Sequence, residues 1–180
     1  MTGVVVETFD KLYNWARANS LWTIIYAASC CGTEMVSSVC SEYSISGCGS
    51  EIFAKSPRQA DLLIIAGTVT HKSALELLHI YEQMAEPKYV IALGACACSG
   101  GIFKNDSYSV VYGADKIIPV DIYLPMCPPK PEALFKALLK LQQKIKSESI
   151  TQRHLYIEAH KPKLVHKSYL DILTEEKTLN

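Results

Sequence analysis

The first repeated pattern along the chain is helical. Apolar residues recur at i, i+3, i+4 and i+7, namely at Phe9, Leu12, Tyr13 and Ala16. This spacing predicts an amphipathic helix that ends near Asn19. Residues 71–84 and 131–145 are predicted to be helical on the same grounds, and a proline begins the second of these stretches, where it suits a first helical turn.

Short and nearly continuous apolar runs lie between these helical stretches. They cover residues 21–28, 62–66, 89–93 and 116–124. Such runs are typical of parallel strands that are buried on both faces. Because strands and helices alternate, we expect an α/β fold: an open, doubly wound, mostly parallel sheet with helices on both faces, of the flavodoxin-like kind.

The length of 180 residues suits one compact domain with a tail. We expect residues 1–146 to form the α/β domain and residues 147–180 to form a polar C-terminal tail. Three histidines in the tail, His154, His160 and His166, are spaced too widely for a helical metal pair. The tail is therefore predicted to be solvated or to contact a partner.

The charge balance argues against nucleic acid as a partner, because Lys+Arg and Asp+Glu are equal at 18 each. The first residues lack the pattern of a secretory or transit peptide. No apolar run approaches the roughly 20 residues of a membrane-spanning helix. The expectation is a soluble, intracellular chain that could sit on a membrane partner.

Cysteines carry the candidate chemistry. Seven is an odd number for a disulfide framework, and a chain of this size can bury a core without such cross-links. Four of the seven stand where predicted strands end: Cys30, Cys31, Cys96 and Cys127. Since ligands bind outside the carboxyl ends of parallel strands, these four thiols are expected to converge on zinc or on an iron–sulfur cluster.

The adjacent pair, Cys30 and Cys31, favours a cluster. Successive side chains of a strand point to opposite faces, so both thiols can serve one site only if the chain leaves the strand there. Two neighbouring thiolates would crowd one tetrahedral zinc ion, whereas a cluster offers separate iron atoms; structural zinc sites more often use C-x-x-C pairs. A vicinal disulfide, two buried thiols and a competing ligand at Cys98 remain alternatives.

Several stretches resemble the B-type subunit of the NADH-quinone oxidoreductases, the respiratory complex I family, which carries the terminal iron–sulfur cluster. They are NSLW (19–22), CCGTEM (30–35), SPRQADLLIIAGT (56–68), YEQMAEPKYVIALGACACSGG (81–101), YSVVYGADKIIPVDIYLP (108–125) and CPPKPEAL (127–134). The resemblance covers about residues 9–146. Small subunits of membrane-bound nickel–iron hydrogenases are related, but they tend to have C-x-x-C at the first position, so the tandem cysteines favour the quinone branch.

The resemblance implies one [4Fe-4S] cluster held by the four cysteines named above, which passes electrons to quinone and is coupled to proton translocation. It implies as partners a large catalytic subunit at the quinone site, a ferredoxin-like iron–sulfur subunit and membrane-arm subunits. It also implies a peripheral position on the cytoplasmic face of a bacterial plasma membrane, or its organelle equivalent. Met35, Glu34 and Trp22 are its candidates for the quinone side.

The sequence departs from the family pattern at several positions. Met126 replaces the glycine before the fourth cysteine, and we expect this to alter the turn there. Gly47, Cys48 and Ala54 stand where the family has Arg, Phe and Arg. Loss of positive charge at these positions is expected to lower the potential of the cluster or to alter its proton coupling.

Two other functions stay open on the sequence. One is the small subunit of an energy-converting nickel–iron hydrogenase-type complex, and the other is a zinc-stabilised structural subunit. Neither a P-loop nor a G-x-G-x-x-G motif follows any predicted strand, which argues against a nucleotide enzyme.

Overall fold

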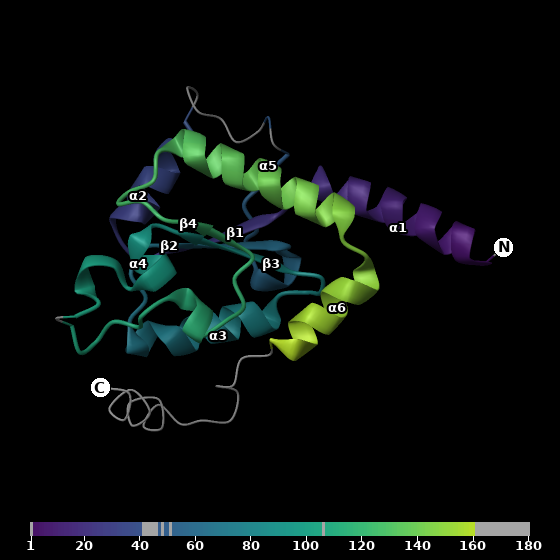
Figure 1. Cartoon of the computed structure of the whole chain (residues 1–180). Coiled ribbons are helices and arrows are strands. Elements are labelled where there is room, and N and C mark those ends of the chain that lie inside the picture. The colour runs from purple at the N-terminus through teal and green to yellow at the C-terminus, as the bar shows by residue number, and fades with distance from the viewer. Residues whose placement is uncertain (1, 41–46, 48, 51, 106, 161–180) are drawn as a thin grey trace.

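The structure is a computed structural model, and it describes residues 2–40, 47, 49–50, 52–105 and 107–160. Its centre is a parallel sheet of four strands (Figure 1). The strands are β1 (Thr23–Ala27), β2 (Leu62–Ala66), β3 (Tyr89–Leu93) and β4 (Ile122–Leu124). They lie side by side in chain order, β1-β2-β3-β4, without the reversal of strand order that flavodoxin-like sheets contain.

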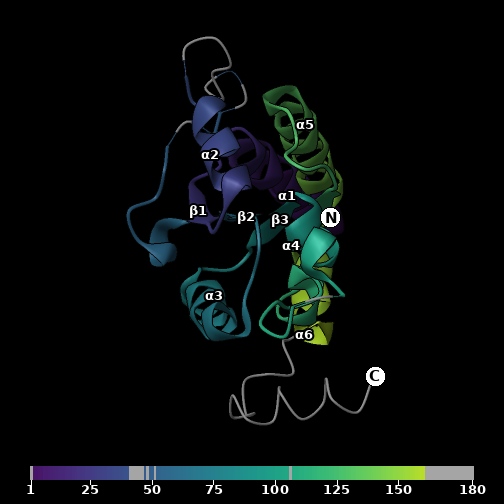
Figure 2. The same cartoon turned by 90° about the vertical axis from the view of Figure 1, so that its left-hand side faces the viewer.

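Helices cover both faces of this sheet, which confirms the predicted α/β fold class. On one face lie α1 (Thr2–Ala18), α2 (Cys30–Ser37) and α5 (Pro131–Ser147). On the other lie α3 (His71–Gln83) and α4 (Ala95–Ser99). Figure 2 shows the sheet between the two layers. Two 3₁₀ turns, η3 (Pro57–Gln59) and η4 (Gly101–Phe103), lie in the connections.

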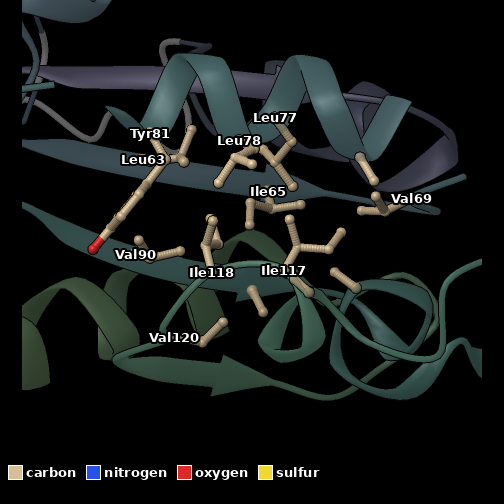
Figure 3. Close-up of a cluster of buried hydrophobic side chains, with 14 of the residues drawn as sticks. Leu63, Ile65, Val69, Leu77, Leu78, Tyr81, Val90, Ile117, Ile118 and Val120 are labelled. Carbon is tan, nitrogen blue, oxygen red and sulfur yellow. The ribbon is translucent and has the colours of Figure 1, made fainter. Parts of the chain in front are cut away.

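The two cores follow from the alternation of side chains along the central strands. Leu63 and Ile65 of β2 point toward Leu77 of α3 (Figure 3). Their neighbours Leu62 and Ile64 pack on the α5 side instead. Because both faces are covered, every residue of β2 and β3 is buried, as the continuous apolar runs predicted.

The predicted strand over residues 116–124 is wrong over most of its length. Only the last three residues form β4, and a third 3₁₀ turn, η5 (Ala114–Lys116), occupies the start of the run. Pro119 cannot donate to a ladder, so it interrupts pairing. Ile117 and Ile118 are nevertheless buried, because this loop packs against the α3 side of the sheet.

Some of the predicted tail is helical. Helix α6 (Ile150–Ala159) follows α5 and begins with a capping box at Ser149. Arg153 and Ile157 of this helix are buried. Residues 161–180, with His166, lie outside the described residues, and a domain boundary at residue 146 stays a prediction. Among the described helices, none is both long and apolar enough to cross a bilayer.

Candidate metal centre

The candidate site lies at the carboxyl ends of β1, β3 and β4. We call it the cysteine edge and define it by Cys30, Cys31, Cys96 and Cys127. Helix α2 begins at Cys30, shortly after β1, and α4 carries Cys96 shortly after β3. Cys127 follows closely after β4. Figure 1 shows α2 and α4 at the same, left-hand end of the sheet. The four cysteines that follow predicted strands in the sequence therefore lie at one edge of the sheet.

The chain leaves the strand before the tandem cysteines, as one site for both requires. β1 ends at Ala27, and Ser29 is the N-cap of α2, so Cys30 and Cys31 both lie in the first helical turn. Consecutive helical residues point about 100° apart rather than to opposite faces. The first amides of a helix also favour negatively charged sulfur.

The four thiols are close enough to affect one another. Burial and, to a smaller extent, the charges of Cys30, Cys96 and Cys127 together raise the pKa of the Cys31 thiol to about 11. All six cysteines within the described residues are free of disulfide bonds. Thiolates would repel one another here, so the site suits a positively charged group that neutralises several sulfurs together.

The site is partly closed to water. Cys31 and Cys96 are buried, with 1% and 6% of their surface exposed, whereas Cys30 and Cys127 are exposed. A group bound to all four sulfurs would have one side against the sheet and one side toward the surface. Such a position suits exchange of electrons with a partner protein.

Two glycines keep backbone close to sulfur. Gly94 has a φ of 95°, and a Cβ atom there would clash with the Sγ atom of Cys31. Gly101 has a φ of 57°, and its Cβ would lie 2.9 Å from the Sγ atom of Cys96. Both glycines adopt conformations that other residues avoid. A side chain at either position would fill space beside a thiol that a bulky group needs.

Backbone hydrogen bonds fix Cys96 relative to Cys127. Gly94 N donates to Leu124 O at 2.9 Å, and Ala95 N donates to Met126 O at 2.8 Å. The pairing of β3 with β4 thus continues beyond β4 to the residue before Cys127. The distance between the two thiols therefore depends on the register of the two strands.

Ser29 ties the tandem cysteines to β2 and was missed by the sequence interpretation. Its hydroxyl accepts a hydrogen bond from Thr68 N at 3.3 Å, just after β2. Its carbonyl accepts another from Gly32 N at 2.8 Å. A serine between a strand and a helix is an N-cap signal, which could have indicated this position.

The donor set fits an iron–sulfur cluster. Within the described residues, no group of three His, Cys, Asp or Glu side chains that could hold one metal ion is found. The four thiols are free of disulfides and three of them act electrostatically on Cys31, and a [4Fe-4S] cluster takes four cysteine thiolates, each on a different iron atom. The residues present therefore fit the cofactor that the resemblance implied.

Cys98 takes no part in this arrangement. It packs against the α3-side core and donates through Sγ to Ala92 O at 3.6 Å. Burial raises the pKa of its thiol, which keeps Cys98 neutral at ordinary pH. Cys40 is also separate, since it is exposed at the end of α2 and its Sγ donates to Val36 O at 3.7 Å. Cys48 lies outside the described residues.

The three residues predicted for the quinone side do not lie together. Met35 is 2% exposed and packs into the core between the sheet and α5. Glu34, its neighbour in α2, is half-buried one turn after the tandem cysteines. Trp22 precedes β1, and its carbonyl accepts a hydrogen bond from Asp61 N, so it lies at the other end of the sheet. A role near quinone stays a prediction for all three.

The departures from the family pattern also separate in space. Met126 directly precedes Cys127 and is half exposed; no described non-glycine residue has a positive φ, so the backbone there does not require glycine. Ala54 N donates to Thr23 O, which places Ala54 beside the start of β1. Gly47 is exposed. A charged side chain at position 54 would thus lie near the start of β1, at the end of the strand opposite to the cysteines.

Comparison with known proteins identifies the family. Residues 22–141 match the family described as "NADH ubiquinone oxidoreductase, 20 Kd subunit". The chain belongs to this family. The matched range of the 20 kDa-subunit family includes all four strands and all four cysteines of the site.

Individual relatives agree with this assignment. The chain is 52% identical to the B-type subunit of NADH-quinone oxidoreductase from Campylobacter fetus, over 84% of this chain and 89% of the relative. It is 48% identical to the K-type subunit of NAD(P)H-quinone oxidoreductase from Prochlorococcus marinus, over 98% of this chain and 77% of the relative. The chain is thus a member of a family of oxidoreductase subunits, as its sequence predicted.

A solved structure shares the fold. It is a chain in the structure of the membrane-bound sulfane sulfur reductase (MBS), an archaeal respiratory membrane complex. The TM-score is 0.74 and the identity 33%, over 89% of this chain and 93% of that chain. The fold of the 20 kDa-subunit family is therefore also found in a complex whose name does not include quinone.

Proposed function

We propose that this chain is the electron-transfer subunit of a complex I-type NADH-quinone oxidoreductase. In this proposal Cys30, Cys31, Cys96 and Cys127 hold one [4Fe-4S] cluster. When bound, the cluster would supply one-electron redox chemistry. The chain itself would make and break no bonds of a substrate.

The observation that carries the proposal is the gathering of four free thiols at one edge of the sheet, two of them buried and two exposed. Family membership makes an oxidoreductase complex the context for these thiols. A zinc-stabilised structural subunit is less well supported, because structural zinc sites more often take their thiolates from C-x-x-C pairs than from adjacent cysteines such as Cys30 and Cys31.

The chain's own residues would bind, orient and shield the cluster. The buried sulfurs of Cys31 and Cys96 would hold its inner side, and the exposed sulfurs of Cys30 and Cys127 its outer side. The glycine at position 94 would leave room beside the sulfur of Cys31, because an added Cβ atom there would collide with Sγ. The exposed side would face the partner that accepts electrons.

We assign quinone as the acceptor, at an interface with a large catalytic subunit. The curated relatives described above are named for quinone reduction. A ferredoxin-like subunit would supply the electrons, and membrane-arm subunits would couple the reaction to proton translocation. Association with the membrane would be peripheral, through these partners.

The second candidate is the equivalent subunit of another respiratory membrane complex. The observation in its favour is the fold shared with a chain of the archaeal sulfane sulfur reductase complex. The identity to the quinone relatives is higher, at 48% and 52% against 33%. Reduction of quinone by the purified complex, compared with reduction of a sulfane sulfur compound, distinguishes the two.

Electron paramagnetic resonance of the anaerobically purified complex tests the cluster. We expect a [4Fe-4S] signal on reduction, with iron and acid-labile sulfide in matching amounts. Cys96→Ser should abolish or strongly change this signal. Cys98→Ser is the matched control, since it lies in the same helix but packs into the α3-side core, and it should leave the signal intact.

Two results would contradict the proposed function. Zinc in place of iron in the purified complex would support the zinc-stabilised structural subunit instead. A signal that persists unchanged in both Cys31→Ser and Cys96→Ser complexes would mean that other residues hold the cluster.

A further inference from the structure

A network of charged residues occupies the end of the sheet opposite to the cysteines. We call this end the amino edge and define it by six charged residues, Arg17, Asp61, Lys88, Asp121, Lys144 and Arg153. Asp61, Lys88 and Asp121 each directly precede a strand. Figure 1 shows α6, which carries Arg153, at this right-hand end of the sheet.

Arg153 is the central cation of this network. Its side chain is 2% exposed and pairs with that of Asp121, which is 1% exposed. The contact is bidentate, with Nη1 to Oδ1 at 2.5 Å and Nη2 to Oδ2 at 2.7 Å. Lys144 adds a second cation at 2.7 Å from Oδ1. A planar guanidinium matches a carboxylate in this way and a lysine ammonium does not.

Arg153 also contacts the neighbouring strand. Its Nη2 atom donates to the carbonyl of Lys88, the residue before β3, and its guanidinium lies 4.2 Å from the ring centre of Tyr89. Asp121 in turn accepts a hydrogen bond from Val90 N at 3.0 Å. One side chain of α6 therefore bridges the starts of β3 and β4.

Two of the four cysteines follow these two strands: Cys96 comes after β3 and Cys127 after β4. β4 has three residues, lies at the edge of the sheet and, among the described strands, pairs only with β3. Beyond β4, Ala95 N still donates to Met126 O, next to Cys127. A short edge strand has few hydrogen bonds to hold its register. Contacts at its start therefore affect where the residues at its end lie.

We propose that Arg153 is a positioning residue for the metal centre: it clamps the starts of β3 and β4 and so sets the register that places Cys96 beside Cys127. This inference rests on the proposed function. It assigns α6, which lies beyond the boundary expected at residue 146, to the unit that shapes the centre.

The test compares Arg153→Met with Arg17→Met in the purified complex. Arg17 is the matched control, because it also lies at the amino edge and pairs with Asp61 at 3.7 Å. It touches the start of β3 through the Pro87 carbonyl and the Tyr89 ring but, within the described residues, contacts neither Asp121 nor β4. One readout is the midpoint potential and line shape of the cluster signal. The other is amide hydrogen exchange in residues 120–127.

We expect Arg153→Met to shift the potential and line shape and to speed exchange in residues 120–127 by at least about tenfold, because a buried carboxylate loses its main partner. Arg17→Met should change neither. If Arg153→Met does not assemble, Arg153→Lys replaces it. Because an ammonium cannot reproduce the bidentate contact of the guanidinium with Asp121, Arg153→Lys should give the same changes to a smaller extent.

An unchanged signal and unchanged exchange in the Arg153 variants would overturn the inference, as would equal changes in Arg17→Met. Failure of the proposed function is distinguishable from either result. It would appear in the unmodified complex, as a missing [4Fe-4S] signal.

Discussion

The two ends of the parallel sheet are built from different chemistry. At the amino edge, buried charges meet partners from the same chain, as Asp121 meets Arg153 and Lys144. At the cysteine edge, four sulfur donors face one another, and two of them are exposed. In the first arrangement the buried carboxylate of Asp121 already has its cationic partners within the chain, whereas the second arrangement gains from an added group. Substitutions at the amino edge should therefore cost stability, and those at the cysteine edge should cost the cofactor.

The largest effect is expected from Asp121→Ala. It leaves two cations, the buried Arg153 and the half-buried Lys144, without their shared carboxylate. Breaking a buried ion pair from one side typically costs about 3–5 kcal/mol. Thermal denaturation of the purified complex should show a lower midpoint for this subunit. A midpoint like that of the unmodified complex would mean that the amino edge does not stabilise the fold.

Gly94→Ala should affect the other end of the sheet more specifically. The added methyl would clash with Sγ of Cys31, in a backbone conformation that costs a non-glycine residue about 1–3 kcal/mol. We expect a several-fold weaker [4Fe-4S] signal from the cluster of this subunit. Gly47→Ala is the control, because an added Cβ there meets no atom within 4 Å among the described residues beyond its chain neighbours. Equal signals in the two variants would contradict this role of the glycine.

The pH dependence of stability should separate the two edges further. Burial alone would raise the pKa of the Asp121 carboxyl, but hydrogen bonds and charge from Arg153 and then Lys144 hold it below its ordinary value of 3.8. A lowered pKa in the folded state stabilises the protein above pH 3.8, and this contribution is lost as the pH falls below that value. When the stability of Asp121→Asn is measured against falling pH, the variant should not show this loss. If both proteins lose stability equally below that pH, another carboxyl is responsible.

The smallest effect is expected from Met126→Gly, which restores the residue typical of the family. The backbone at Met126 is not left-handed, so glycine relieves no strain and only adds freedom to the unfolded chain. That freedom costs about 0.5–1 kcal/mol. The potential of the cluster should not change. A clear shift on redox titration would show that the side chain at this position, next to Cys127, influences the centre.

The sequence could place the four cysteines after the strands of one sheet because that inference uses only local signals. Continuous apolar runs located β2 and β3 at their observed bounds, and the residue after each run then marks one edge of a parallel sheet. The sequence does not separate Cys96 from Cys98, because they differ in the direction in which each side chain leaves α4; in the structure Sγ of Cys98 donates to Ala92 O.

The amino edge could not be predicted in this way. The partner of Asp121 lies 32 residues further along the chain, in a segment whose polar composition indicated a tail. Many lysines and arginines are equally available to pair in the sequence. Only the packing of α6 against the start of β3 selects Arg153. The extent of β4 was mispredicted for a related reason, since buried loop residues such as Ile117 look like a strand when only hydropathy is considered.

The place of Arg153 in the chain has a consequence for biosynthesis. All four cysteines have been translated by residue 127, but the residue that clamps β3 to β4 is made 26 residues later, in the last described helix. A ribosome exposes the chain from its N-terminus, so a nascent subunit has every ligand before it has the clamp. Cluster insertion should therefore wait for the emergence of α6 rather than follow directly on that of the cysteines.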